Sequence, residues 1–169
     1  KLSLKNKIIL IIKMPENIED KIIKSILNCG AKLIIIEKSI NKLSKLYDKI
    51  KKKKYENIFL YPMDILYNTQ KDYYKLVNFL YINFGRIDGI IYDLPELGKS
   101  SPFEQYEIQE LYKIMNKNFY DKFIMLKIIT PLIKLSKNPS IIFITHNIKN
   151  LNTYWSGYAC ANTALQTLI

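Results

Sequence analysis

A tyrosine near the C-terminus is the residue whose type and surroundings best suit proton transfer. Tyr158 lies in the run Tyr-Trp-Ser-Gly-Tyr-Ala-Cys-Ala-Asn at residues 154–162, which is typical of the start of an active-site helix. A tyrosine hydroxyl has a pKa near 10, so acid-base work at neutral pH needs a cation about one helical turn away to stabilise the phenolate. That position is held by the uncharged Asn162. The sequence therefore predicts a proton-transfer site that lacks its usual electrostatic support.

Five short apolar runs, which must position this tyrosine, alternate with segments of helical periodicity. The runs at residues 7–12, 32–36, 57–63, 87–92 and 140–145 are typical of strands buried on both faces. Helices are expected around 18–27 with Gly30 as the cap, at 39–53, from about 68 to 84, and from about 104 to 135. Pro131 predicts a kink or break near the end of the last helix.

This alternation predicts an α/β fold of the Rossmann type, a doubly wound parallel sheet with helices on both faces. Residues 1–169 are expected to form a single domain, because one ordinary core accommodates a chain of this length that is 49% hydrophobic. In such a sheet the ligand lies outside the carboxyl ends of the strands. Residues 13–20, 37–38, 93–101 and 146–154 are therefore expected to line the ligand site.

The composition disfavours several classes of function. The net charge of +11 comes from 26 basic and 15 acidic residues, but the lysines are spread along the chain and Arg86 is the one arginine, which disfavours nucleic-acid binding. No apolar run reaches the roughly 18 residues of a membrane span, and no signal peptide opens the chain. Cys29 and Cys160 lack metal-binding spacing and are expected as buried, reduced thiols, which favours a cytoplasmic location.

With the strands placed, the order of landmarks resembles the short-chain dehydrogenase/reductase family over essentially the whole chain. Members of that family transfer hydride between a nicotinamide dinucleotide and a carbonyl or alcohol. The resemblance is carried by Asp64 after the third strand, Ile87-Asp88-Gly89-Ile90-Ile91 as the fourth, Asn118 in the long helix, Thr130-Pro131-Leu132-Ile133 near its end, and Trp155-x-x-Tyr158. It implies NAD or NADP as the cofactor and a small carbonyl or alcohol as the substrate.

The resemblance assigns the cofactor's pyrophosphate to residues 12–19, where the family carries Thr-Gly-x-x-x-Gly-x-Gly. This chain reads Ile-Lys-Met-Pro-Glu-Asn-Ile-Glu there, with Lys13, Asn17 and Ile18 at cofactor-binding positions. Glycines let the backbone approach the pyrophosphate, whereas these side chains obstruct it and the glutamates add negative charge. Lys13 is the one compensating cation. Dinucleotide binding in the usual pose is therefore expected to be impaired.

Further cofactor-binding positions are implied after the next three strands. Glu37 would bind the ribose hydroxyls of NAD and Lys38 the 2′-phosphate of NADP, so the pair does not choose between them. It is equally possible that Glu37 and Lys38 are only an exposed charge pair at the end of a strand and bind no cofactor. Asp64 follows the third strand and Asp93 the fourth, where Pro95 replaces a glycine and removes a backbone donor.

The resemblance also implies four catalytic positions. Asn118 and Tyr158 match the family, and Asn162 stands where the family has lysine. The fourth position is a catalytic serine in the family. Counting back from Tyr158 places it at Thr145, whereas aligning the fifth strand with the family pattern places it at His146. Thr145 would supply a hydroxyl, whereas a lone histidine at a strand end is more often structural.

Three functions remain open on this basis. The first is an NAD(P)-dependent oxidoreductase with impaired or lost activity, in which Tyr158 is the acid-base, Thr145 orients the carbonyl and Asn118 holds a relay water. The second is a non-catalytic interaction or scaffold protein that forms homo-oligomers through the helices at 104–135 and 154–169. The third and weakest is a basic nucleic-acid-associated protein. Family members continue beyond this length, so the C-terminal strand and helix units are expected to be missing.

Overall fold

The computed structural model describes residues 3–12, 16–53, 55–64, 69–92, 95–147 and 153–168. The chain divides into two compact units, one made of residues 1–93 and 128–143 and the other of residues 94–127 and 144–169. A single domain spanning residues 1–169 stays a prediction.

The first unit is built on a five-stranded sheet in the order β3-β2-β1-β4-β5, in which every neighbouring pair is parallel. β1 pairs with β2 on one side and with β4 on the other, so that Ile11 lies opposite both Ile35 and Ile91. The strand order reverses at β1 and β4, which confirms the predicted doubly wound topology. The strands are β1 (Ile8–Ile12), β2 (Lys32–Glu37), β3 (Ile58–Pro62), β4 (Gly89–Tyr92) and β5 (Ser140–Phe143).

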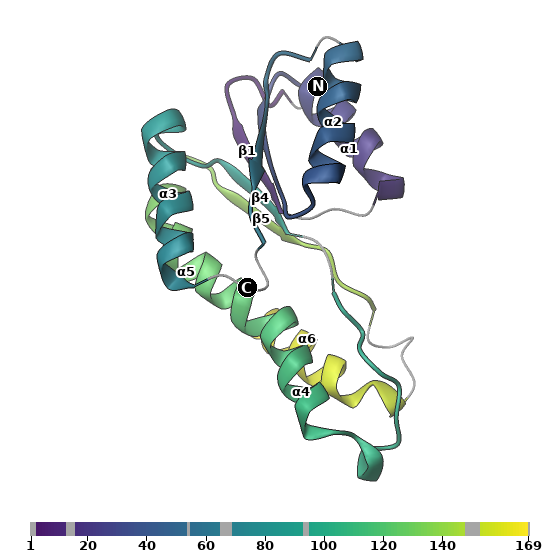
Figure 1. The fold of residues 1–169 in the computed structure, drawn as a ribbon. Helices are drawn as coiled ribbons and strands as arrows, with labels where there is room; N and C mark the ends of the chain where they lie inside the picture. The colour runs from purple at the N-terminus through teal and green to yellow at the C-terminus, as the bar shows by residue number, and fades with distance from the viewer. Residues whose placement is uncertain are drawn as a thin grey trace. The chain divides into compact units, whose positions relative to one another are not determined.

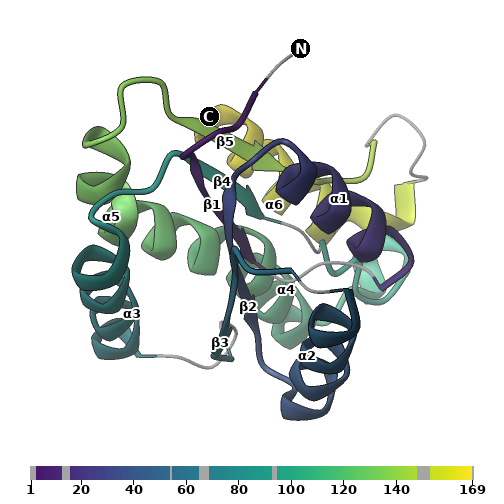
Figure 2. The same ribbon diagram turned by 90° about the horizontal axis from the view of Figure 1, so that it is seen from above.

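Helices cover both faces of this sheet, as the alternating pattern predicted. α1 (Glu16–Asn28) and α2 (Ile40–Lys53) lie on one face, and α3 (Gln70–Phe84) lies on the other (Figure 1, Figure 2). α3 begins with a capping box in which Thr69 and Asp72 exchange hydrogen bonds. It ends at Gly85, which adopts a φ of 77° and donates its N–H to the Tyr81 carbonyl.

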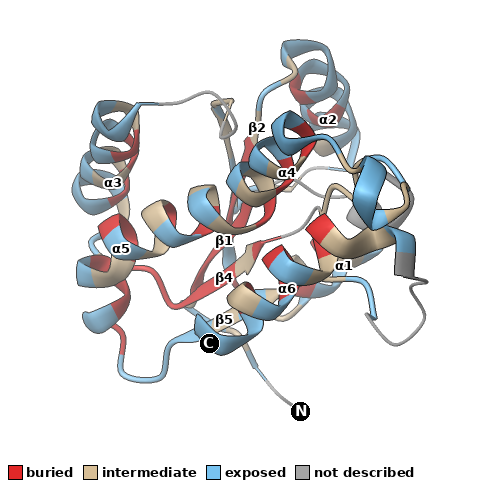
Figure 3. Cartoon of the chain, turned by 90° about the horizontal axis from the view of Figure 1, so that it is seen from below, coloured by how far each residue is buried: buried red, intermediate tan, exposed pale blue. Residues whose placement is uncertain are grey.

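The core of the first unit lies between the central strands and the helices. Ile11, Leu33 and Ile35 from the sheet pack with Ile23 of α1 and Leu46 of α2, and the most buried strand residues lie in β1, β2 and β4 (Figure 3). The expectation that all five strands are buried on both faces was wrong for β3 and β5. These are the two outermost strands of the described sheet, and Ile142 in β5 is 50% exposed.

A buried carboxylate anchors the amino end of β4. Asp88 accepts hydrogen bonds from the Ser136 hydroxyl at 2.6 Å, the Ile8 N–H at 2.9 Å and the Arg86 Nε at 3.1 Å. Lys7 adds an ion pair at 3.5 Å. These contacts join the start of β1, the start of β4 and the segment before β5, so they fix how the central strands begin.

The second unit contains α4 (Ile108–Met115), the π-helical turn η3 (Asn116–Tyr120), the start of α5 (Asp121–Lys134) and α6 (Ser156–Leu168). The long helix predicted at 104–135 is observed from Ile108 to Lys134, with the π-helical turn η3 inside it. The Asn118 Nδ2 donates to the Ile114 carbonyl at 3.0 Å, and a side chain that takes such an acceptor disturbs the helical hydrogen-bond ladder there. Pro131 does not end the helix, since α5 continues to Lys134.

Candidate functional site

Two side chains of α6 hold the segment that follows β5. The Tyr158 hydroxyl oxygen accepts a hydrogen bond from the His146 N–H at 3.0 Å, and the Asn162 Nδ2 donates to the His146 carbonyl at 3.2 Å. Because residues four apart share one face of a helix, Tyr158 and Asn162 reach the same peptide from consecutive turns. Both side chains are almost fully buried.

All four predicted catalytic residues line one small cavity within the second unit. Asn118 comes from η3, Thr145 from the segment after β5, and Tyr158 and Asn162 from α6. The cavity offers about 10 Å³, about the room for one water molecule. The Asn162 Oδ1 is a buried acceptor with no hydrogen-bond partner among the described residues. The geometry brings these residues together, while their catalytic roles stay predictions.

The electrostatic surroundings of Tyr158 keep its phenol protonated. Burial raises the pKa of Tyr158 above its usual value of 10.0, and the hydrogen bond from the His146 N–H opposes that rise only in part. The neutral phenol can donate its proton to an oxygen atom, but the phenolate left behind would need a nearby positive charge.

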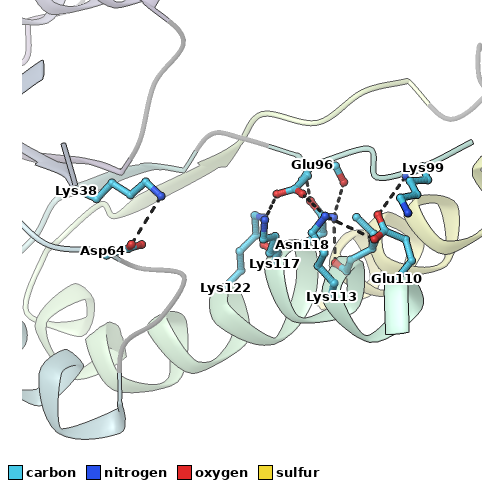
Figure 4. Close-up of polar contacts among 10 residues, drawn as sticks. Lys38, Asp64, Glu96, Lys99, Glu110, Lys113, Lys117, Asn118 and Lys122 are labelled. Atoms are coloured by element: carbon cyan, nitrogen blue, oxygen red, sulfur yellow. Dashed lines mark hydrogen bonds and ion pairs between the residues drawn. The ribbon is translucent and has the colours of Figure 1, made fainter. Parts of the chain in front are cut away.

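Asn118 is held by backbone partners on both sides of its amide. Its Oδ1 accepts from the Glu96 N–H at 2.9 Å, and its Nδ2 donates to the Glu96 carbonyl at 2.8 Å as well as to Ile114 (Figure 4). This arrangement fixes the segment after β4 against η3. Asn118 therefore shapes one wall of the cavity through its backbone contacts.

The charges beside Asn118 are paired with one another. Glu96 forms ion pairs with Lys117 and, at 3.1 Å, with Lys113 (Figure 4). Burial alone would raise the pKa of the Glu96 carboxyl, but the hydrogen bonds from Lys117 and Lys113 outweigh burial and lower it. Glu96 therefore stays ionised, and its negative charge offsets these two lysines.

The two candidates for the serine position contribute in different ways. Thr145 lines the cavity with its neighbours, and a hydroxyl there can orient a carbonyl oxygen. His146 is exposed, and it meets Tyr158 edge-on with ring centroids 5.8 Å apart. Its peptide group, rather than its ring, makes the hydrogen bonds with α6. This geometry favours Thr145 as the hydroxyl group of the site.

Sequence reasoning missed the charged residue of this cavity. Lys122 in the first turn of α5 is 2% exposed, lines the cavity, and donates from Nζ to the Lys117 carbonyl at 3.1 Å. Lys122 follows Asn118 by four residues, so the two are expected on the same face of the helix. This spacing was the signal in the sequence that Lys122 lies near the site.

The implied cofactor positions belong to the first unit where they are described. Glu37 accepts the Ser39 N–H at 2.9 Å, and Lys38 forms an ion pair with Asp64 at 3.7 Å (Figure 4). Lys13 and Asp93 lie outside the described residues, as do the side chains of Asn17 and Ile18. α1 begins at Glu16, and residues 12–19 contain none of the glycines that let the backbone approach the pyrophosphate in the family pattern.

Other site classes find no support in the described part of the chain. None of its helices is long and apolar enough to cross a membrane. Its histidines, cysteines and carboxylates form no group of three that could hold a metal ion. Both cysteines are free thiols, but the predicted burial of Cys160 was wrong: it is exposed on α6, because its place two residues after Tyr158 turns it away from the buried face.

Comparison with known proteins agrees with this architecture. The oxidoreductase YciK of Escherichia coli K12, described as uncharacterized, is 21% identical over 167 residues, which is 98% of this chain and 66% of that protein. The chain thus spans about two thirds of the length of this relative. A short chain dehydrogenase from Salmonella enterica serovar Typhi matches with a TM-score of 0.87 at 20% identity, covering 98% of this chain and 68% of the other.

A protein from Escherichia coli CFT073, solved in complex with NADPH, matches with a TM-score of 0.86 at 21% identity over 97% of this chain and 69% of its own. Likeness at this identity shows the shared fold. The model of the short chain dehydrogenase family matches residues 7–169, which include the whole sheet and the Tyr158 cavity. The chain therefore belongs to the short-chain dehydrogenase family of oxidoreductases.

Proposed function

We propose that this chain is a short-chain dehydrogenase that keeps the acid-base geometry around Tyr158 but whose dinucleotide-dependent turnover is impaired or lost. The observation that carries this proposal is the glycine-free segment 12–19 in front of α1. Without glycine, this segment cannot bring its backbone amides as close to the pyrophosphate, and the negative charges of Glu16 and Glu19 would repel the phosphates. The reaction class is hydride transfer between a carbonyl or alcohol and a nicotinamide dinucleotide, which when bound would donate the hydride to the carbonyl or accept it from the alcohol.

The residues of the Tyr158 cavity have distinct parts in this proposal. Tyr158 donates its phenolic proton to the substrate oxygen, or accepts one in the reverse direction. Thr145 orients the same oxygen through its hydroxyl, and Asn118 keeps the cavity wall in place through Glu96. The substrate is a small carbonyl or alcohol compound, because the family acts on that class.

The cofactor in this proposal is NADP or NAD, bound weakly. The NADPH complex of the Escherichia coli CFT073 protein favours NADP as the first to test. Lys38 could meet a 2′-phosphate only by leaving its ion pair with Asp64, and Glu37 could meet a ribose hydroxyl only by sharing its bond with Ser39. Lys13, Asn17, Ile18 and Asp93 remain proposed contacts.

Turnover by the Asn162→Lys variant tests the proposal. Oxidation of NADPH and NADH is followed by absorbance over a panel of aldehydes and ketones, with the parent chain and Tyr158→Phe as matched controls. We expect neither the parent nor Asn162→Lys to exceed Tyr158→Phe, because a restored lysine leaves segment 12–19 unchanged. Tyr158-dependent turnover in the single variant would refute the proposed defect in dinucleotide binding.

A second candidate function is protein interaction, favoured by exposed aromatic residues in the second unit. Tyr112 is 65% exposed on α4, Tyr120 49% in η3, and Phe123 41% on α5. Tyr120 and Phe123 both contact the Phe119 ring, and grouped exposed apolar residues mark contact surfaces more often than single ones do. If homo-oligomers form through these helices, sedimentation shows dimers or tetramers that Tyr112→Glu dissociates. A strictly monomeric parent protein would count against this function.

A further inference from the structure

One face of the sheet in the first unit contains an apolar groove. A cavity of about 310 Å³ lies against β4 and β5, where Gly89 and Ile91 pair in register with Ser140 and Ile142. Residues two apart on a strand share one face of a sheet, so these four positions form one side of the groove. Ile26 of α1 also lines it. The volume reaches the range of about 300–1,000 Å³ that is typical of small-molecule sites.

The groove is open to solvent along β5. Ile142 is 50% exposed, and Ile91 packs only in part against the core beneath α1. β5 contains no charged residue. Gly89 lowers the floor of the groove, because a side chain there would begin 2.7 Å from the Cδ1 of Ile9. An alkyl chain that entered this groove would remove exposed apolar surface from water, which is favourable.

One end of the groove is basic. A second cavity, of about 290 Å³, is lined by Leu135, Lys7, Arg86, Asp88 and Lys137. Lys7 and Asp88 also line the apolar groove, so the two cavities are neighbours at the start of β4. Three cations and one carboxylate meet there, which leaves an excess of positive charge at this end.

Lys137 is the cation of this end that the fold does not use. Asp88 pairs with Lys7 at 3.5 Å and with Arg86 at 3.1 Å. Lys137 is exposed in the segment between α5 and β5, and it makes no hydrogen bond or ion pair with any residue that the structure describes. Its ammonium can therefore bind an anion without breaking a contact of the fold.

We propose that this face of the first unit binds the anion of a free fatty acid, with its carboxylate at Lys137 and Lys7 and its alkyl chain in the groove over β4 and β5. The apolar groove disfavours a small polar anion, and the basic end disfavours an uncharged hydrocarbon. Asp88 lies beside the carboxylate position, so a single negative charge fits better there than a dianion. The site shares no residue with the Tyr158 cavity and is independent of dinucleotide binding.

Calorimetric titration of the full chain with hexanoate, octanoate and decanoate, each below its micelle concentration, tests the proposal. We expect the affinity to rise about four-fold for each added methylene group, because each one buries further apolar surface in the groove. Octanol has the chain of octanoate without the charge, and it should bind several-fold more weakly. Equal affinity for the three acids would overturn the proposal, because it would leave only the attraction of an anion to a basic chain.

Two variants test the two ends of the site. Ile142→Asp should weaken decanoate binding at least about ten-fold, since it places a charge beside the alkyl chain. Ile82→Asp is its control, because Ile82 is 72% exposed on α3, which covers the other face of the sheet. Lys137→Ala should weaken binding a few-fold. Its control is Lys45→Ala, an exposed lysine of α2. Equal losses in a variant and its control would contradict the site.

Isoleucine methyl NMR on the parent chain locates the ligand without relying on Ile142→Asp being folded. Decanoate should shift the methyl signals of Ile9, Ile26 and Ile91 and leave those of Ile82 in place. Shifts that spare these three residues would overturn the proposal. A dimer of the parent chain that Ile142→Asp dissociates in sedimentation would also overturn it, because a second copy would then cover the groove.

Discussion

Asp88 is the clearest case of a single residue on which the sheet depends. It is 4% exposed, and its carboxylate joins the start of β1, the start of β4 and Ser136 through hydrogen bonds of 2.6 to 3.1 Å. Burial acts to raise the pKa of Asp88, but the hydrogen bonds from Ser136, Ile8 and Arg86 outweigh it, so the pKa is lowered. The folded state therefore prefers the ionised carboxylate.

This preference gives the stability a defined pH dependence. The pKa of Asp88 in the folded state lies below its value of about 3.9 in the unfolded chain. The stabilisation that Asp88 provides is therefore complete above about pH 5, and it is lost as the pH falls through the pKa of the unfolded chain and then through that of the folded state. We predict that Asp88→Asn lowers the free energy of unfolding by about 2–4 kcal/mol at pH 7. The difference from the parent should shrink between about pH 5 and pH 2, measured by urea denaturation.

Asp48→Asn is the control for this measurement, because Asp48 is exposed on α2. It should change the unfolding free energy by less than about 0.5 kcal/mol at either pH. A constant difference between Asp88→Asn and the parent across this pH range would contradict the ionised anchor.

At the scale of elements, the π-helical turn η3 positions residues of the candidate site. The π-helical turn contains Asn118 and leads into the first turn of α5, where Lys122 begins its path to the cavity. Asn118 bonds the Glu96 backbone on one side and the Ile114 carbonyl on the other. A change at Asn118 should therefore disturb both the turn and the segment after β4.

We predict that Asn118→Leu lowers the free energy of unfolding by about 2–4 kcal/mol, since it leaves the N–H and carbonyl of the half-buried Glu96 and the carbonyl of the buried Ile114 without this partner. Urea denaturation followed by circular dichroism measures the loss. Asn83→Leu is the control: its amide also donates to a carbonyl four residues before it, at 2.8 Å, but on an exposed helix surface. Equal losses in the two variants would show that Asn118 does not brace the site.

The elements differ in how far the sequence alone predicts them. The strands of the central sheet follow from isoleucine-rich runs, and Gly30 and Gly85 end α1 and α3 near the predicted positions because both need positive φ. The π-helical turn η3 inside the long helix was not predicted; its Asn118 contacts Glu96, which is 22 residues away in sequence. Periodicity contains no information on such a contact.

The candidate site shows the same limit. Tyr158, Asn162 and Asn118 are identified by their resemblance to the family pattern, and the geometry brings them to one cavity with Thr145. Lys122 was missed because its place in the same cavity as Tyr158 depends on segments that are far apart in the sequence. A buried lysine cannot be distinguished from an exposed one by residue type, so its partner emerges only from the structure.

At the scale of the whole molecule, charge complicates any measurement of cofactor binding. The net charge of +11 attracts every polyanion, including the pyrophosphate of a dinucleotide, whether or not a specific site exists. Attraction between exposed charges falls steeply as salt rises, whereas contacts in a formed site are screened much less. Affinity measured at two salt concentrations therefore separates the two kinds of binding.

Calorimetric titration of the chain with NADPH, NADP, NADH and NAD at low and high salt tests the central claim most directly. The claim is that this member of the family keeps the fold and the Tyr158 cavity while segment 12–19 no longer holds a dinucleotide in the usual pose. We predict weak binding at low salt that disappears at high salt. Micromolar binding that persists at high salt would contradict the claim, because it would mean that the glycine-free segment still holds the pyrophosphate.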